Sequence, residues 1–271
     1  MNKRGRSLRP GLSLLPLRAG CQLHGCRFVH IMRRVSEKTS MIARYAGGER
    51  GARAAARAGS AVVVVDAFRA STTMAVLVKK GARVVPVASI EEARSYAGAD
   101  LRAGERGSAM VAGFDFGNSP TEILASDVPV GSTVVLSTTN GTRVVEAARG
   151  APAILTGAFV NASALADELA AGGYSSLVVV GCGWEGRRAS EDEAAAGAIL
   201  QRLACRGAEL DERARRVVEA YSSRPAGRLR DNSAARRLKR LGYERDLAFC
   251  LAEDAVPVVP RLVNGAFVGG R

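Results

Sequence analysis

Apolar residues fall into short runs, and each run is followed by a segment with helical spacing. Residues 61–65 are wholly apolar and rich in valine, and residues 71–81 run from hydroxyl side chains through apolar positions to Gly81. The first pattern predicts a buried strand, and the second predicts a helix that ends at the glycine. An acid, Asp66, stands directly after the strand.

The same succession recurs four times downstream. The further predicted strands are residues 84–87, 134–136, 154–156 and 177–180. A predicted helix follows each strand. The first begins with a Ser89/Glu92 capping box and ends at about Ala97, and the second ends at about Ala148. The third is capped by Asn161 or Ser163 and ends at Ala171, and the fourth begins with a Ser190/Glu193 capping box and ends at about Cys205. Such alternation predicts βαβ units with helices on both faces of a sheet.

The last third of the chain is mainly helical in pattern. Helices are predicted over 209–221, 232–241 and 244–253, and a hairpin over 256–268 that turns at Asn264-Gly265. The fold class expected is therefore α/β, a three-layer α/β/α arrangement. Its sheet is mainly parallel, with a mixed sheet as the variant, and its C-terminal portion is helical.

Charge divides the chain unevenly. The net charge is +13, but residues 1–60 hold 13 Lys and Arg against two acids, whereas the remainder holds 26 basic and 24 acidic residues. We therefore expect residues 1–40 to be a disordered basic extension, with Met32 and Met41 as later starts, and residues 41–271 to be a single domain. The near-neutral remainder argues against nucleic acid as a partner.

Composition limits the available chemistry further. No apolar run is long enough to cross a membrane, and five widely spaced cysteines suit a reducing, cytoplasmic setting. His24 and His30 are the only histidines. They stand near Cys21 and Cys26 in a spacing that matches no common zinc finger. A Ser-His-Asp triad or a His-rich metal centre in residues 41–271 is therefore not expected.

The stretch G-C-G-W-E-G-R-R, residues 181–188, admits two interpretations. Gly181, Gly183 and Gly186 spell the dinucleotide fingerprint of an NAD(P)-binding oxidoreductase, and Cys182 with Arg188 spells the loop of a cysteine-dependent phosphatase. Against the dinucleotide interpretation, no helix starts at the last glycine and no second strand follows. Against the cysteine-phosphatase interpretation, Glu185 stands where a phosphate dianion would bind. Both stay open as alternatives.

Other polar segments follow predicted strands. They are D-A-F-R-A-S-T from Asp66, G-E-R-G at 104–107, G-F-D-F-G-N-S-P at 113–120 and S-T-T-N-G-T-R at 137–143. Hydroxyls and glycines at a helix start suit a bound anion, and an acid at a strand end can hold Mg²⁺ or attack phosphorus. Parallel strands gather such segments at one edge of their sheet.

Together with G-A-F-V-N-A-S and W-E-G-R-R-A-S-E-D, these blocks resemble the 2-phosphosulfolactate phosphatases, the ComB-type enzymes of coenzyme M biosynthesis. The resemblance spans about residues 60–260 and follows the family's block order. It implies Mg²⁺-dependent hydrolysis of 2-phospho-3-sulfolactate, or a similar small polyanionic phosphomonoester, to sulfolactate and phosphate. Mg²⁺ prefers oxygen ligands, which suits a segment without histidine.

Roles are assigned on that basis. Asp66 is the expected nucleophile or principal Mg²⁺ ligand, Glu185 a second ligand or general acid/base, and Asp192 a further ligand. The acid groups of the substrate are expected to bind Arg69, Ser71, Thr72, Arg106, Asn118, Thr138, Thr139, Asn140 and Arg187. A small polyanionic substrate is the only partner predicted, and homo-oligomerisation is left open.

Overall fold

The computed structural model describes residues 41–223 and 226–270. The predicted basic extension and the Cys21–His30 segment lie outside these residues. The strands are β1 (Ile42–Gly47), β2 (Ala61–Val65), β3 (Arg83–Val87), β4 (Leu101–Arg106), β5 (Ala109–Met110), β6 (Thr133–Ser137), β7 (Ile154–Thr156), β8 (Ser176–Gly181), β9 (Glu209–Leu210), β10 (Pro260–Val263) and β11 (Ala266–Gly269).

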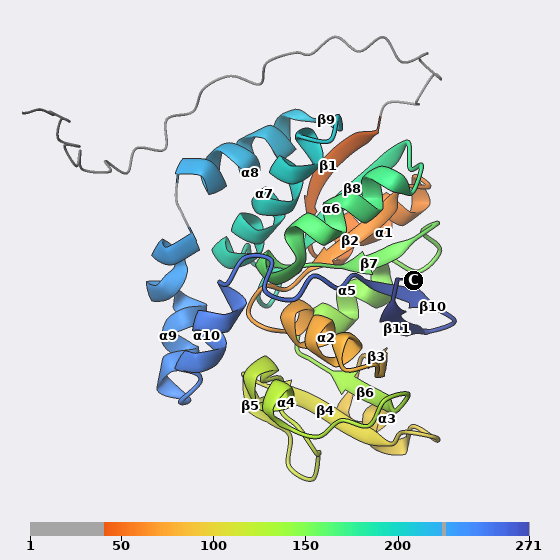
Figure 1. Ribbon diagram of the computed structural model, residues 1–271, viewed down its shortest axis with the longest axis vertical. Helices are drawn as coiled ribbons and strands as arrows, with labels where there is room; N and C mark the ends of the chain where they lie inside the picture. The colour runs from red at the N-terminus through yellow and green to blue at the C-terminus, as the bar shows by residue number, and fades with distance from the viewer. Residues whose placement is uncertain (1–40, 224–225, 271) are drawn as a thin grey trace, which may run out of the picture. The chain divides into compact units, whose positions relative to one another are not determined.

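The helices are α1 (Gly48–Arg57), α2 (Ala70–Lys79), α3 (Ile90–Ser95), α4 (Pro120–Ala125), α5 (Gly141–Ala147), α6 (Ala162–Ala171), α7 (Ser190–Ala204), α8 (Glu212–Ser223), α9 (Ser233–Arg240) and α10 (Glu244–Cys250), with the 3₁₀ turns η1 (Phe159–Asn161) and η2 (Ala226–Asp231). They flank one mixed, mainly parallel sheet (Figure 1). The predicted three-layer α/β/α class is confirmed.

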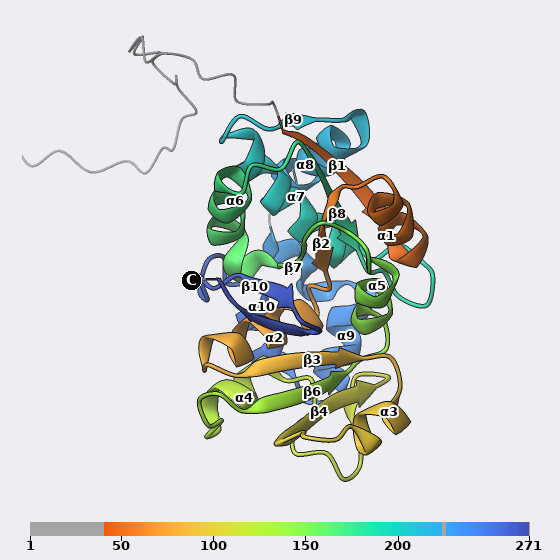
Figure 2. The ribbon, with the colours of Figure 1, turned by 90° about the vertical axis from the view of Figure 1, so that its right-hand side faces the viewer.

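The C-terminal hairpin joins two parallel groups of strands. The strand order is β5-β4-β6-β3-β11-β10-β7-β2-β8-β1-β9. β11 pairs antiparallel with β3 and β10 pairs antiparallel with β7, so the group β4-β6-β3 is reversed along the sheet relative to β7-β2-β8-β1. Figure 2 shows the first group lying across the view while β2 and β8 run nearly vertically. This rotation brings the carboxyl ends of β2 and β6 together.

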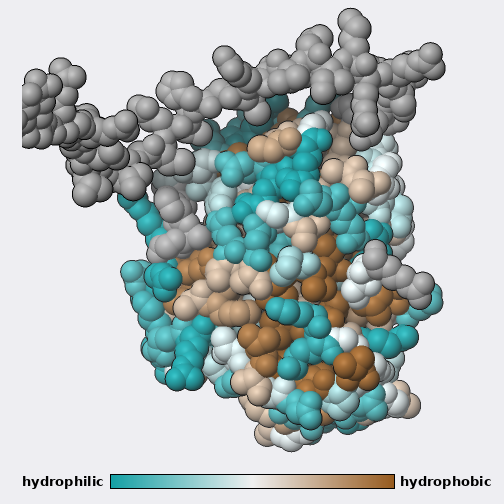
Figure 3. All heavy atoms as spheres, viewed as in Figure 1, coloured by the Kyte–Doolittle hydropathy of each residue, from teal (hydrophilic) through white to brown (hydrophobic). Residues whose placement is uncertain are grey.

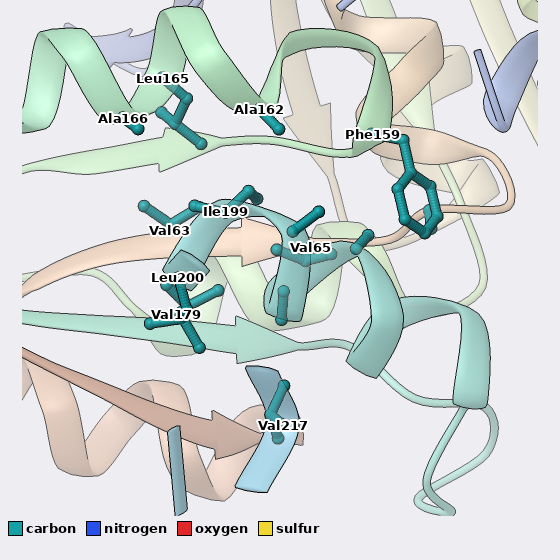
Figure 4. Close-up of a cluster of buried hydrophobic side chains, with 14 of the residues drawn as sticks. Val63, Val65, Phe159, Ala162, Leu165, Ala166, Val179, Ile199, Leu200 and Val217 are labelled. Carbon is teal, nitrogen blue, oxygen red and sulfur yellow. The ribbon is translucent and has the colours of Figure 1, made fainter. Parts of the chain in front are cut away.

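Successive side chains of the central strands enter two separate cores. Val63 and Val65 pack with α6 and α7 on one face, whereas Val62 and Val64 pack with α1, α2 and α5 on the other. Figure 4 shows Val63, Val65 and Val179 facing Ile199 and Leu200 of α7. Burial on both faces is why these strands read as continuous apolar runs rather than as alternation.

Several predicted boundaries are confirmed and others are wrong. The Ser89 hydroxyl accepts the Glu92 N–H at 3.0 Å, and Asn264 and Gly265 adopt φ of 49° and 81° in the hairpin turn. Ser190 does not cap α7, because it is already the first helical residue and Ala189 takes the cap position. Glu209 belongs to β9, which pairs with β1, so the predicted helix begins only at Glu212.

Helix α9 presents a basic outer face. Arg236 and Arg240 are exposed, and Ala234, Ala235 and Leu238 are buried against the core. In Figure 3 hydrophilic residues cover this edge of the molecule, and apolar residues gather over the region of α2. None of the helices in the described residues is long and apolar enough to cross a membrane.

Candidate active site

One polar pocket lies where β2, β6 and β8 end. Carboxylates, two arginines and two aromatic rings line it. Its lining residues are Asp66, Phe68, Arg69, Glu105, Ser108, Asn118, Asn140, Gly183, Trp184, Glu191, Asp192 and Arg237. The candidate site therefore lies at predicted strand ends, although its residues come from six separate segments of the chain.

Asp66 stands at the centre of this pocket. The strand β2 ends at Val65, so the next residue leaves the sheet, and the Ser71 hydroxyl accepts the Asp66 N–H at 2.9 Å. The Oδ1 atom accepts only a 3.3 Å bond from the Ala70 N–H, and no hydrogen bond within the described residues reaches Oδ2. A Cβ at Gly141 would lie 3.2 Å from Oδ2, so glycine is what allows the β6–α5 segment to approach.

Asp192 connects the two segments beside Asp66. Its Oδ1 accepts the Ala67 N–H and its Oδ2 accepts the Gly183 N–H, each at 2.8 Å. The side chain is 4% exposed and lies in the first turn of α7, where the helix dipole favours an acid. Asp192 therefore fixes the segments after β2 and β8 relative to one another.

The carboxylates are crowded. Burial and the charge of Glu105 raise the pKa of Asp66 from 3.8 to about 7. Burial and the charges of Asp66 and Glu191 raise the pKa of Asp192 well above its ordinary value. Like charges in a low-dielectric pocket oppose ionisation, so a cation bound among them would be strongly favoured.

Glu105 is a site residue that the sequence interpretation passed over in favour of its neighbour Arg106. Residues 104–106 belong to β4 rather than to the predicted turn. The Glu105 carboxylate accepts the Ser108 N–H at 2.6 Å and the Thr139 N–H at 2.7 Å. It thereby joins the turn after β4 to the segment after β6. Arg106 does not line the pocket and donates to the Glu105 carbonyl and the Ser137 hydroxyl.

Arg69 lines the pocket, but its charge is already matched. Its guanidinium donates to Asp246 Oδ2 and to the Ser108 carbonyl, both at 2.7 Å, and lies 4.1 Å from the centre of the Tyr243 ring. Asp246 also accepts the Ser119 hydroxyl at 2.8 Å. With both partners of the ion pair 1% exposed, Arg69 acts first as a fixed part of the pocket wall.

Arg237 is the pocket cation that has no carboxylate partner within the described residues. Its Nε donates to the Ser108 hydroxyl at 2.9 Å, and its guanidinium lies 3.7 Å from the centre of the Trp184 ring. Burial lowers its pKa, and the charges of Glu191 and Glu105 oppose that shift. A guanidinium held this way still offers donors to an incoming anion.

Buried oxygens without partners gather beside the pocket. Asn118 Oδ1, Thr138 Oγ1 and Thr139 Oγ1 have none, and within the described residues only Ser132 Oγ shares that condition. Asn118 and Asn140 line the pocket, whereas Thr138 and Thr139 do not line it but precede Asn140 in the same segment. Buried polar atoms are normally satisfied, so these atoms are suited to a ligand. All three residues were among those predicted to bind the substrate.

Ser71 and Thr72 are turned into the protein. The Ser71 hydroxyl lies 2.7 Å from that of Thr156, and the Thr72 hydroxyl donates to the Ala67 carbonyl at 3.4 Å. Neither lines the pocket. Their hydroxyls hold the start of α2 in place instead of facing a ligand.

Residues 184–187 form a hairpin with a two-residue turn, and this geometry excludes the dinucleotide interpretation. Trp184 and Arg187 exchange two backbone hydrogen bonds of 2.9 Å, and Glu185 and Gly186 adopt φ of 48° and 77°. The Glu185 and Arg187 side chains are exposed and do not line the pocket. Gly186 therefore serves a turn, and α7 begins only at Ser190, so the fingerprint geometry is absent at this segment.

The cysteine-phosphatase interpretation also fails on geometry. Cys182 is buried, and burial together with Asp66 and Asp192 raises its pKa well above the ordinary value, the reverse of what a thiolate nucleophile needs. Arg188 donates to both carboxylate oxygens of Glu193, at 2.5 and 2.8 Å, and does not line the pocket. No anion-binding loop is formed by the pair.

Comparison with known proteins identifies a matching family. Residues 48–265 match the family model described as 2-phosphosulpholactate phosphatase. The chain belongs to this family. It is a phosphoric monoester hydrolase by class.

Individual relatives cover most of the chain. A probable 2-phosphosulfolactate phosphatase of Synechococcus sp. (strain JA-2-3B'a(2-13)) is 41% identical over 214 residues, which are 74% of this chain and 88% of the relative. Proteins of the same description from Gloeobacter violaceus and Thermotoga petrophila are each 38% identical, covering 86% and 90% of their own lengths. The match spans the segments that build the pocket.

The donors in the family pocket suit a hard cation. Asp66 Oδ2 and Asn118 Oδ1 are oxygens without hydrogen-bond partners, and Glu191 Oε1 accepts no bond within the described residues. No group of three or more His, Cys, Asp or Glu side chains in those residues is close enough to hold a metal alone. In particular, the predicted set Asp66, Glu185 and Asp192 is not assembled. Mg²⁺ usually takes one or two carboxylates and completes its shell with water and phosphate oxygens.

The pocket is narrow. Its volume is about 20 Å³, close to the space for one water molecule. A substrate with three acid groups therefore needs side chains to move. Trp184 and Arg237 are the partly exposed members that meet across it.

Glu185→Gln is expected to change kcat for phosphate release by less than about threefold. The reason is that the Glu185 side chain is exposed outside the pocket, and only its N–H reaches the site, donating to Asn140 Oδ1 at 3.2 Å. Steady-state kinetics of Glu185→Gln are compared with those of Glu105→Gln, which replaces a carboxylate that lines the pocket. A loss of about 100-fold or more in Glu185→Gln would restore the catalytic role predicted from the sequence.

Proposed function

We propose that the protein hydrolyses 2-phospho-3-sulfolactate, or a similar small polyanionic phosphomonoester, to sulfolactate and phosphate with Mg²⁺. The observation that carries the proposal is Asp66, whose Oδ2 is free of hydrogen bonds in a pocket that also holds Arg237. The relatives, described as probable 2-phosphosulfolactate phosphatases, supply the substrate class. In the reaction, water adds to phosphorus, the bond from phosphorus to the ester oxygen breaks, and the leaving alkoxide takes a proton.

The oxygens of Asp66, Asn118 and Glu191 that accept no hydrogen bond would hold the metal, with Asp192 as a further ligand. When bound, Mg²⁺ polarises the phosphoryl group and offsets its charge. Asp192 also keeps the Ala67 and Gly183 amides in position, so replacing it would disturb the segment that carries Asp66. Whether Asp66 contributes as a ligand or as a nucleophile, its reacting atom is Oδ2.

The protein's own donors account for the anionic groups of the substrate. Arg237 is the cation available for a sulfonate or carboxylate, and Arg69 forms the fixed wall beside it. The Thr138 and Thr139 hydroxyls are donors without acceptors at the start of α5. Charge-assisted hydrogen bonds of this kind are each worth about 1.5–3 kcal/mol.

Chelation tests the proposed metal. With EDTA, phosphate release from 2-phospho-3-sulfolactate should fall at least about 100-fold and return with excess Mg²⁺, because a metal-held phosphoryl group carries several kcal/mol of the stabilisation. Cys182→Ala should stay within about threefold of the parent protein, since the thiol is buried and protonated. Activity that resists EDTA would contradict the proposed metal requirement. Loss of activity in a folded Cys182→Ala variant would support a mechanism in which the thiol is the nucleophile.

A further inference from the structure

A second and much larger cavity lies apart from the catalytic pocket. It is bounded by β1, α7, α8 and η2, and its volume is about 800 Å³, against about 20 Å³ for the pocket at Asp66. Figure 1 shows α7 and α8 side by side. Asn232 stands at the boundary: it lines the large cavity, and its amide donates to Glu191 Oε2 of the catalytic pocket at 2.7 Å.

Part of the cavity wall is apolar. Tyr45, Val217, Tyr221 and Leu229 contribute rings and branched chains from three different elements, β1, α8 and η2. Volumes of about 300–1,000 Å³ with mainly apolar walls and a few polar groups are typical of sites for small organic ligands. The catalytic pocket has the opposite character, since carboxylates, arginines and amides dominate it.

Two arginines in the cavity wall have no acidic partner among the described residues. Arg188 is paired with Glu193, and Arg216 with Glu212 at 2.9 Å. Arg213 and Arg228 make no ion pair with any carboxylate of the described residues. The Arg213 guanidinium instead lies 5.1 Å from the centre of the Tyr45 ring. The acid Asp231 is already paired with Lys239 at 2.9 Å.

We propose that this cavity binds an organic anion with a flat apolar body, such as an aryl sulfonate or aryl carboxylate. The body would pack against Tyr45 and Leu229, and the acid group would take the free donors of Arg213 and Arg228. Guanidinium groups bind such acids with paired N–H donors and stack on aromatic faces. The site is independent of the phosphatase proposal, because none of its arginines lines the catalytic pocket.

The test is a fluorescence titration of the whole protein with 8-anilinonaphthalene-1-sulfonate. One saturable site is expected, and Arg213→Glu should weaken it at least about tenfold, as the loss of a charge-assisted contact does. Arg215→Glu is the matched control: it makes the same charge change on the exposed side of the same helix but does not line the cavity. Its affinity should equal that of the parent protein.

Two further measurements separate this cavity from the catalytic pocket. Arg237→Ala and an excess of inorganic phosphate should both leave the titration unchanged. The proposal is overturned if no saturable binding occurs, if Arg213→Glu and Arg215→Glu bind alike, or if Arg237→Ala or phosphate abolishes binding. Thermal unfolding of each variant checks that the probe reports a folded site, and Arg213 is exposed enough for its replacement to leave the fold intact.

Discussion

Asp66→Asn is expected to lower kcat for phosphate release by about 10³-fold or more. The substitution keeps the shape of the side chain and removes the negative charge at Oδ2, the pocket oxygen that accepts no hydrogen bond. Losing one preorganised electrostatic contact to a transition state typically costs about 10²–10³-fold, and a metal ligand or nucleophile costs more. Initial rates with saturating Mg²⁺ measure the effect.

The same variant should be more stable than the parent protein at high pH. The pKa of Asp66 is raised from 3.8 to about 7 in the folded state, so the native protein holds this proton more tightly than the unfolded chain does. Ionisation therefore costs the metal-free parent stability as pH rises from about 4 through 7. The asparagine variant avoids this loss of stability, which is on the order of 4 kcal/mol.

Thermal unfolding in EDTA checks this expectation. Asp66→Asn should unfold several degrees higher than the parent at pH 8 and at nearly the same temperature below about pH 4, where the Asp66 carboxyl is protonated in both the folded and the unfolded chain. A variant that unfolds lower at pH 8 would show that the carboxylates stabilise the fold instead of opposing it. A folded and active Asp66→Asn would contradict the central role of this residue.

Arg237→Ala is expected to lower kcat/KM by about 10- to 100-fold, chiefly through KM. Arg237 is the pocket cation without a carboxylate partner in the described residues, and a charge-assisted contact worth about 1.5–3 kcal/mol corresponds to that range. The effect should shrink with a phosphomonoester that lacks the sulfonate. Kinetics with both substrates give the measurement.

Arg236→Ala is the matched control for that experiment. Arg236 is the neighbouring residue of α9, is exposed and lies outside the pocket, although it donates to the Asp231 carbonyl. Its kinetics should match those of the parent protein. Equal losses in the two variants would mean that α9 matters for folding or general charge, and an unchanged Arg237→Ala would remove the residue from the site.

Local sequence patterns predicted the elements that build the pocket edge. The valine run of β2 is buried on both faces, so hydrophobicity alone placed Asp66 at a strand end. Capping at Ser89 and the left-handed turn at Asn264-Gly265 depend on neighbouring residues only, and they too were predicted. The α/β class follows from the alternation of such elements.

Some errors have a local cause and others concern partners that are distant in the chain. Ser190 looked like a cap, but Glu193 bonds Arg188 and the helix starts one residue earlier. Glu185 looked central because glycines surround it, yet the hairpin at 184–187 turns its side chain to solvent. Nothing in the local pattern of α9 marked Arg237, whose role depends on Trp184 and Ser108.

The sequence by itself determined the central strands, the C-terminal hairpin, most helices and the acid that follows β2, because short-range hydrophobic spacing and capping depend on adjacent residues. It did not predict β1, β4, β5 or β9. The tertiary structure alone decided that the C-terminal hairpin joins two oppositely directed groups of strands and that their twisted ends converge on Asp66. It also decided which charges are already matched, as at Arg69 with Asp246, and which are left for a ligand, as at Arg237. Arg69 and Asp246 are separated by more than 100 residues in the chain, so no local pattern predicts their pairing.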